Sequence, residues 1–82
     1  MKTYEIRFKK QAKKFIESRN KKEKQRILHE IRKLPFGNHI KKMEAYENRY
    51  RLRVGDYRIV YEKYKNEFLI VVIEADNRGD IY

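Results

Sequence analysis

The most regular alternation of apolar and polar residues lies in the middle of the chain, over residues 50–61. The pattern on either side of Gly55-Asp56 has the period of two half-buried strands. A two-residue loop that begins with glycine suits a type II′ turn, because that turn requires a positive φ at its first position. The pattern therefore predicts a β-hairpin in which Val54 lies opposite Tyr57 and the preceding residues pair in step.

This register divides the hairpin into an apolar and a basic face, since successive side chains of a strand point to opposite sides. The apolar face consists of Tyr50, Leu52, Val54, Tyr57, Ile59 and Tyr61. The other face carries Arg51, Arg53 and Arg58, with Arg53 directly opposite Arg58. Like charges across a strand pair destabilise a sheet by up to about 1 kcal/mol. The three arginines therefore suggest an anion-binding surface, most plausibly for phosphates, although a solubilising face is the alternative interpretation.

Before the hairpin, the apolar spacing changes from that of a strand to that of helices. Residues 2–7 alternate and predict a short edge strand, whereas residues 8–16 have apolar positions at helical spacing. A second helix is predicted over residues 22–34, where Pro35 ends it. The two helices should be antiparallel and joined by a short turn at residues 19–21.

The segments around the hairpin complete the expected fold. Residues 36–48 lack a regular pattern, residues 68–73 are continuously apolar and predict a central strand, and residues 74–82 form a polar tail. Neither helix is apolar enough to stand alone, so both should cover a sheet. The expectation is one α+β domain over residues 1–82 with the order β-α-α-β-β-β. Its helical hairpin should pack on one face of a mainly antiparallel four-stranded sheet.

The charge balance narrows the class of partner. The chain has 82 residues, with 22 Lys and Arg against 12 Asp and Glu, and a formal net charge of +10. At this size such an excess favours a polyanion, with nucleic acid first, an acidic protein second and an anionic membrane third. The membrane is disfavoured because the basic residues are spread along the chain.

Several function classes are excluded or disfavoured by what the sequence lacks. It contains no cysteine, so it can form neither a disulfide framework nor a thiolate metal site. Its N-terminal residues do not form a signal peptide, and residues 68–73 are too few to span a bilayer. A cytoplasmic protein that does not enter a membrane is the expectation.

The chain resembles the RelE/ParE superfamily of toxins from toxin–antitoxin systems. The order of elements, the hairpin sequence of residues 50–61 and the tail Asn-Arg-Gly-Asp-Ile-Tyr of residues 77–82 carry the resemblance. RelE-type members are implied to cut messenger RNA in the ribosomal A site, whereas ParE-type members share the fold and are implied to poison DNA gyrase. The resemblance also implies two partners, a cognate antitoxin and the mRNA, and no cofactor.

The resemblance implies five catalytic residues. Arg51 and Arg53 stand where RelE-like toxins have paired basic residues, and Arg58 matches an arginine of the next strand. Arg78 matches the arginine after the last strand, and Tyr82 matches the tyrosine of the tail. No metal is implied, so a magnesium cluster formed by the tail carboxylates is disfavoured.

Arginine and tyrosine suit a metal-free cleavage of RNA. The 2′-hydroxyl can attack the adjacent phosphate, and arginines stabilise the added charge by bidentate hydrogen bonding. Guanidinium groups transfer protons poorly, so Tyr82 is the candidate for proton transfer, with stacking on a base as its alternative. The five matched residues favour a ribosome-dependent endoribonuclease. A gyrase-inhibiting toxin and a catalytically silent RNA- or protein-binding module remain alternatives, because a fold does not fix a function.

Overall fold

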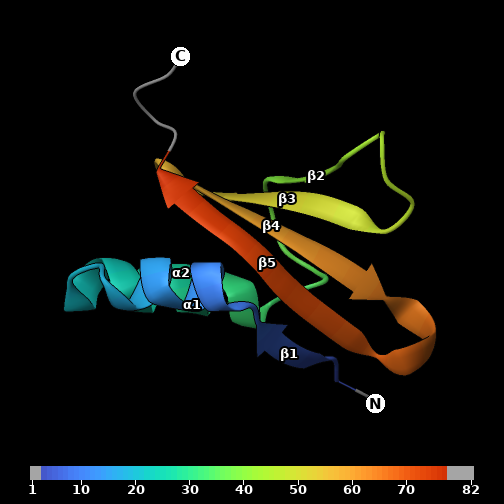
Figure 1. The fold of residues 1–82 in the computed structure, drawn as a ribbon, viewed down its shortest axis with the longest axis horizontal. Coiled ribbons are helices and arrows are strands. Elements are labelled where there is room, and N and C mark those ends of the chain that lie inside the picture. Colours follow the sequence, from blue (N-terminus) through green and yellow to red (C-terminus); the bar gives the residue numbers. More distant parts are fainter. Residues whose placement is uncertain (1–2, 78–82) are drawn as a thin grey trace.

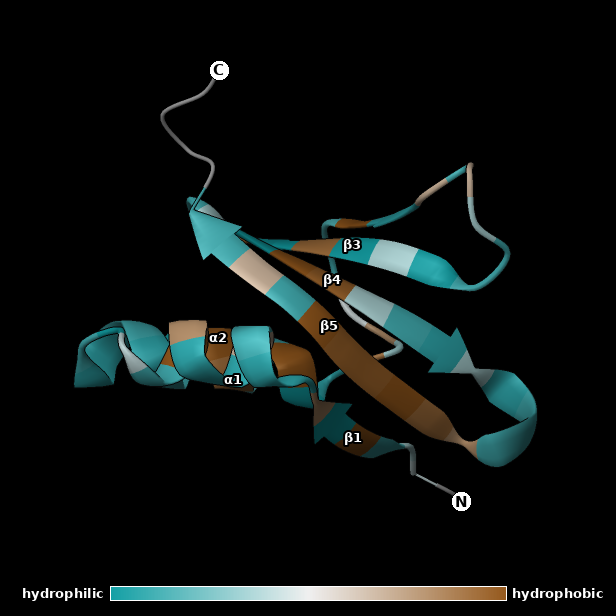
Figure 2. Cartoon of the chain, in the orientation of Figure 1, coloured by the Kyte–Doolittle hydropathy of each residue, from teal (hydrophilic) through white to brown (hydrophobic). Residues whose placement is uncertain are grey.

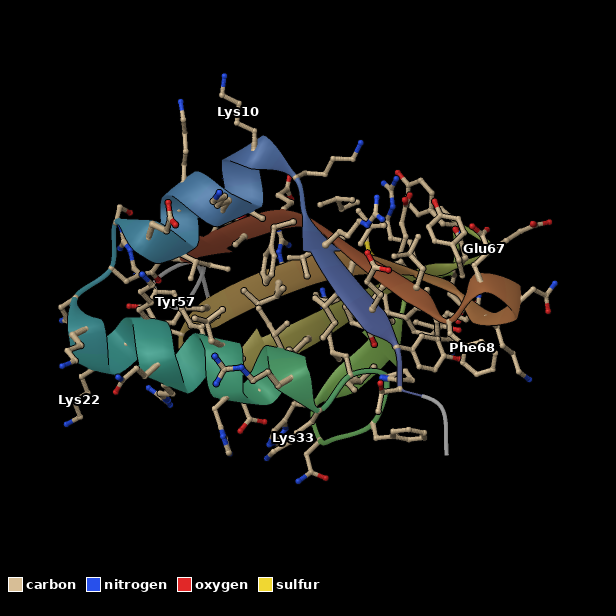
Figure 3. The ribbon with its side chains drawn as sticks, turned by 90° about the horizontal axis from the view of Figure 1, so that it is seen from below. Lys10, Lys22, Lys33, Tyr57, Glu67 and Phe68 are labelled. Atoms are coloured by element: carbon tan, nitrogen blue, oxygen red, sulfur yellow. The ribbon has the colours of Figure 1, made fainter. Side chains whose placement is uncertain are left out.

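The protein is described by a computed structural model that places residues 3–77. Its elements are β1 (Glu5–Phe8), α1 (Lys10–Glu17), α2 (Lys21–Arg32), β2 (Ile40–Lys42), β3 (Arg49–Val54), β4 (Tyr57–Tyr64), the 3₁₀ helix η1 (Lys65–Glu67) and β5 (Leu69–Asn77). The strands form one sheet in the order β1-β5-β4-β3-β2, in which only β1 and β5 are parallel. Both helices lie on one side of this sheet (Figures 1 and 3).

The α+β architecture with a helical hairpin on a mainly antiparallel sheet is confirmed, but the sheet has five strands instead of four. The additional strand, β2, lies in the segment that was expected to be irregular, and it pairs Ile40 with Leu52 of β3. Three residues are too few to show an alternating pattern, so the sequence gives no signal for it. Glu74 to Asn77 also differ from the prediction, because they continue β5 and are not part of a polar tail.

The hairpin has the predicted register throughout. Val54 pairs with Tyr57, and Arg53 pairs with Arg58. Gly55 has a φ of 59°, whereas Asp56 has no positive φ, which is the combination that a type II′ turn requires.

The two helices are short and are joined by a compact turn. Asn20 caps the start of α2, since its side-chain oxygen accepts a hydrogen bond of 2.9 Å from the backbone N–H of Glu23. The helix ends at Arg32, two residues before the predicted end, while Leu34 still packs in the core. Among residues 3–77, no helix is long and apolar enough to cross a membrane.

The hydrophobic core lies between the helices and one face of the sheet. Brown, apolar residues follow the middle of β5 in Figure 2. Tyr57 lies between the two layers, while Lys10, Lys22 and Lys33 point away from the helices (Figure 3). The buried core residues are Ala12, Ile16, Ile27, Ile31, Leu34, Leu52, Val54, Tyr57, Ile59, Tyr61, Ile70, Val72 and Ala75.

A β-bulge lets the whole of β5 contribute to this core. Side chains of a regular strand alternate, so Ile70 and Val72 could not share a face with Ala75. The register shifts by one residue between Val60 and Tyr61 of β4, which places all three β5 residues on the core side. The same shift turns Glu74 to the opposite face.

Replacing Ile70 with alanine should reduce the free energy of unfolding by about 2–5 kcal/mol, because the side chain is fully buried and its removal leaves a cavity. Urea denaturation followed by circular dichroism measures the change. Val71→Ala is the matched control, since Val71 is only partly buried. Equal losses in the two variants would show that β5 does not pack as described.

Candidate functional site

The sheet face opposite the core contains a cleft of about 290 Å³ with arginines on its walls. We call it the arginine cleft. Its lining residues are Met43, Tyr46, Arg49, Arg51, Arg58, Val60, Ile73 and Glu74. They come from β3, β4, β5 and the loop between β2 and β3, so the cleft depends on the tertiary fold and not on the hairpin alone.

Strand pairing arranges the side chains of this face in rows that cross β3, β4 and β5. The rows are Arg53–Arg58–Asp76, Arg51–Val60–Glu74 and Arg49–Glu62–Val71. In the middle row, two strand spacings separate the Cα atoms of Arg51 and Glu74, or about 10 Å. The buried side chain of Val60 lies between them and provides an apolar floor.

Each of the two outer rows contains an ion pair. Arg58 Nη2 lies 3.2 Å from Asp76 Oδ2, and the two side chains are 24% and 31% exposed. Arg49 Nη2 donates a hydrogen bond of 2.9 Å to Glu62 Oε2. The Arg49 guanidinium also stacks on the ring of Tyr46, 4.0 Å from its centroid. These contacts hold Arg49 and Arg58 in place and offset part of their charge.

The middle row differs, because its charged side chains do not pair. Within the described part of the chain, neither the Arg51 nor the Glu74 side chain makes a hydrogen bond or an ion pair. Arg51 is half-buried and Glu74 is exposed. Among the described residues, the cleft therefore has an arginine and a carboxylate that form no ion pair. Arg51 lies on one side of the apolar floor and Glu74 on the other.

Two tyrosines of β4, Tyr61 on the core face and Tyr64 on the opposite face, are poor proton acceptors. Burial raises the pKa of Tyr61 to about 12. The Tyr64 hydroxyl donates a hydrogen bond of 2.7 Å to Glu62, which raises the pKa of Tyr64. Of the carboxylates around the cleft, Glu62 is occupied by Arg49 and Tyr64, so Glu74 is the group best placed to accept a proton from a ligand.

Stability should depend on pH through Glu62. Its pKa is lowered, first by the hydrogen bond from Arg49 and then by that from Tyr64. A carboxyl whose pKa is lower in the folded state stabilises the protein above its unfolded pKa, near 4.3, and this contribution is lost as the pH falls below that value. We therefore expect the stability difference between the wild type and Glu62→Gln to shrink between pH 7 and pH 3.

Urea denaturation at a series of pH values measures this difference. Glu47→Gln is the control, because Glu47 is an exposed carboxylate in the loop before β3. A wild-type advantage over Glu62→Gln that stays constant down to pH 3 would contradict the role of Glu62.

The predicted site residues fall into three groups. Arg51 and Arg58 line the arginine cleft. Arg53 lines a separate depression beside the hairpin turn. Arg78 and Tyr82 lie outside the described residues. Their participation in the site stays a prediction.

Two lining residues with evident chemistry are not among the predicted site residues: Arg49 was not considered, and Glu74 was considered only as part of a disfavoured magnesium cluster. Arg49 precedes Arg51 by two positions, so strand alternation alone could have placed it on the same face. Glu74 could be placed only with the bulge in β5, where Ile73 is the extra residue, and the sequence does not signal it. Among residues 3–77, no cluster of three or more His, Cys, Asp and Glu side chains could hold a metal ion.

Solved structures of RelE toxins are similar to this fold. The RelE–RelB complex from Pyrococcus horikoshii matches 96% of this chain and 99% of the other, with a TM-score of 0.75 and 26% identity. The RelB–RelE antitoxin–toxin complex from Methanococcus jannaschii matches 93% and 94% of the two chains, with a TM-score of 0.74 and 28% identity. The isolated E. coli RelE toxin matches 93% of this chain and 85% of the other, with a TM-score of 0.75. Its 18% identity shows a common fold alone.

The sequence matches no protein-family profile and no curated protein sequence. The assignment therefore depends on structure, in which the likeness extends over nearly the full length of both archaeal toxins. It agrees with the hairpin of residues 50–61, which was predicted from the sequence and has the expected register. The structural likeness therefore supports a toxin of the RelE superfamily.

Proposed function

We propose that this protein is the toxin of a toxin–antitoxin pair and that it cleaves messenger RNA in the ribosomal A site. The toxin assignment is supported by the RelE neighbours, several of which were solved in complex with RelB antitoxins. The observation that supports cleavage is the arginine cleft, in which an arginine and a carboxylate that have no ion-pair partner among residues 3–77 face each other across an apolar floor. A surface that only bound phosphate would gain nothing from that carboxylate.

In this mechanism Arg51 and Arg58 bind the scissile phosphate. The 2′-oxygen forms a bond to phosphorus, and the bond from phosphorus to the 5′-oxygen breaks. Negative charge accumulates on the phosphate oxygens in the transition state, where fixed cations stabilise it most. Arg58 can contribute while its contact with Asp76 persists, since that ion pair involves Nη2 and a guanidinium carries five N–H donors.

Glu74 accepts the proton of the 2′-hydroxyl in this mechanism. The span of about 10 Å between the Arg51 and Glu74 backbones is wide enough for a ribose and its phosphate to lie over Val60. The departing 5′-oxygen takes up a proton, for which the family resemblance suggests Tyr82. Arg78 would add to the positive charge around the phosphate.

The nature of the products tests this proposal. Cleavage on translating ribosomes should give a 2′,3′-cyclic phosphate and a 5′-hydroxyl, and a single 2′-deoxy substitution at the cut site should abolish it. Chelation of divalent metals is not a useful test, because ribosomes need magnesium. Products with 5′-phosphates would refute attack by the 2′-hydroxyl. Inhibition of gyrase supercoiling without RNA cleavage would replace the proposal with the ParE-type function.

The antitoxin would find a suitable surface between β1 and the helices. A groove of about 490 Å³ lies there, with an apolar floor and several basic side chains. It is lined by Ile6, Arg7, Phe8, Lys13, Ile16, Glu17, Lys24 and Leu28. An amphipathic segment with acidic residues at its margins would match this surface in shape and charge.

A further inference from the structure

A second basic hollow, of about 410 Å³, lies at the turn of the β3–β4 hairpin. We call it the turn pocket. Its lining residues are Arg26 of α2, His39 in the loop before β2, Arg53 of β3 and Gly55 of the turn. Three elements distant in the sequence thus bring two arginines and a histidine to one place, and among residues 3–77 no carboxylate belongs to the lining.

Gly55 allows the close approach of Arg26. A Cβ atom at this position would lie 2.5 Å from Arg26 Nη2 and 2.8 Å from its Cζ, so a side chain here would displace the Arg26 guanidinium. The guanidinium of an α2 residue therefore lies directly on the hairpin turn. Glu23, one helical turn earlier, is 3.6 Å from Arg26 Nη1, a long contact between partly exposed groups that offsets little of the charge.

The positions of Arg53 and His39 are also set by the backbone. The N–H of Arg53 donates a hydrogen bond of 3.0 Å to the carbonyl of His39, which continues the β2–β3 pairing by one residue. Arg53 Nε donates a hydrogen bond of 3.3 Å to the carbonyl of Gly55. Arg53 and Arg26 therefore both approach the same glycine, where an anion could accept hydrogen bonds from the two guanidinium groups.

We propose that the turn pocket binds a backbone phosphate of RNA. Arginine forks suit phosphate oxygens, and single-stranded nucleic acids are commonly held in positive grooves that follow their backbone. Arg53 and Arg51 are two residues apart on β3, or roughly 7 Å. This distance is comparable with that between neighbouring phosphates of an extended strand. The inference rests on the proposed function for this geometry, in which the scissile phosphate occupies the arginine cleft.

Binding of a short RNA tests the pocket without any need for catalysis. The probe is a fluorescent RNA pentanucleotide. It carries 2′-deoxyribose at each position where it could be cut, so that it can be bound but not cleaved. Arg26→Gln should weaken its binding about tenfold at low salt and should reduce the log–log salt slope by about 0.7, the value for one phosphate of a single strand. Arg32→Gln is the matched control, because Arg32 is an exposed arginine of the same helix that does not line the turn pocket.

Neutral methylphosphonate linkages, introduced one at a time, locate the phosphate. The effect of Arg26→Gln should disappear when the linkage next to the scissile one is neutral and should persist at the other positions. If the phosphate belongs instead to ribosomal RNA, Arg26→Gln should leave pentanucleotide binding unchanged but weaken binding to ribosomes with an empty A site.

An Arg26→Gln protein that binds both the pentanucleotide and ribosomes as tightly as Arg32→Gln would overturn the inference. Thermal melts of both variants show that neither result reflects misfolding. Cleavage and growth inhibition play no part in these measurements. A protein that binds RNA through the turn pocket but does not cleave it would therefore refute the proposed enzyme and leave this inference intact.

Discussion

Glu74→Gln should slow the cleavage of mRNA on ribosomes by roughly 10²–10⁴-fold, the usual contribution of a general base. Glutamine preserves the shape of the side chain and its ability to hydrogen-bond, but it cannot accept a proton. Glu74 has no described partner in the protein, so its replacement should leave the stability close to that of the wild type. Single-turnover cleavage on ribosomes with a defined codon in the A site measures the effect.

The pH dependence of the same reaction separates proton transfer from simple binding. The wild-type rate should fall at acidic pH as the carboxylate becomes protonated, and Glu74→Gln should lack this decrease. Glu67→Gln is the control, because Glu67 is an exposed carboxylate in η1 outside the cleft. If Glu74→Gln cleaves at the wild-type rate, Glu74 is not the base, and Tyr82 becomes the leading candidate.

Arg58→Gln should reduce the cleavage rate on the order of 10²–10³-fold, as for other groups that stabilise transition-state charge. The same substitution should abolish growth inhibition by the protein. Asp76→Asn should act in the opposite direction. It removes the carboxylate that lies 3.2 Å from Arg58, so more of the guanidinium charge becomes available to the phosphate. RNA binding by Asp76→Asn should equal or exceed that of the wild type.

The fold should survive both substitutions, because the Arg58–Asp76 pair is partly exposed and contacts of this kind contribute little to stability. The double variant Arg58→Gln/Asp76→Asn controls for the carboxylate that Arg58→Gln leaves without its partner. It should be stable and inactive. If Arg58→Gln and the double variant both unfold, Arg58 is a structural residue and has no assigned part in the chemistry.

The hairpin could be predicted from the sequence because its determinants are local. Gly55 specifies the turn, and alternation over a few residues on each side specifies the register, since a slip by one position would expose the apolar face. The basic face follows directly from that register. Arg51 and Arg58 were accordingly predicted to lie together, and they line the same cleft.

The remainder of the site depends on contacts between distant residues, which periodicity does not reveal. Continuing the phase of Ile70 and Val72 would have pointed Glu74 into the core, so the charged residues after Ile73 were interpreted as a tail. The bulge at Ile73 of β5, opposite Val60 and Tyr61, resolves this conflict and extends β5. Likewise, nothing in the sequence of α2 indicates that Arg26 touches the hairpin turn.

The pairing of β1 with β5 has a consequence for folding during translation. β1 is translated before every other described element, yet its neighbour in the sheet is the last described strand, with Glu5 opposite Leu69 and Phe8 opposite Val72. Such a pairing has high contact order and forms late. β5 also supplies Glu74 to the arginine cleft. A nascent chain therefore cannot assemble the arginine cleft until residues 69–77 have emerged from the ribosome, and the proposed cleavage of mRNA cannot begin before then.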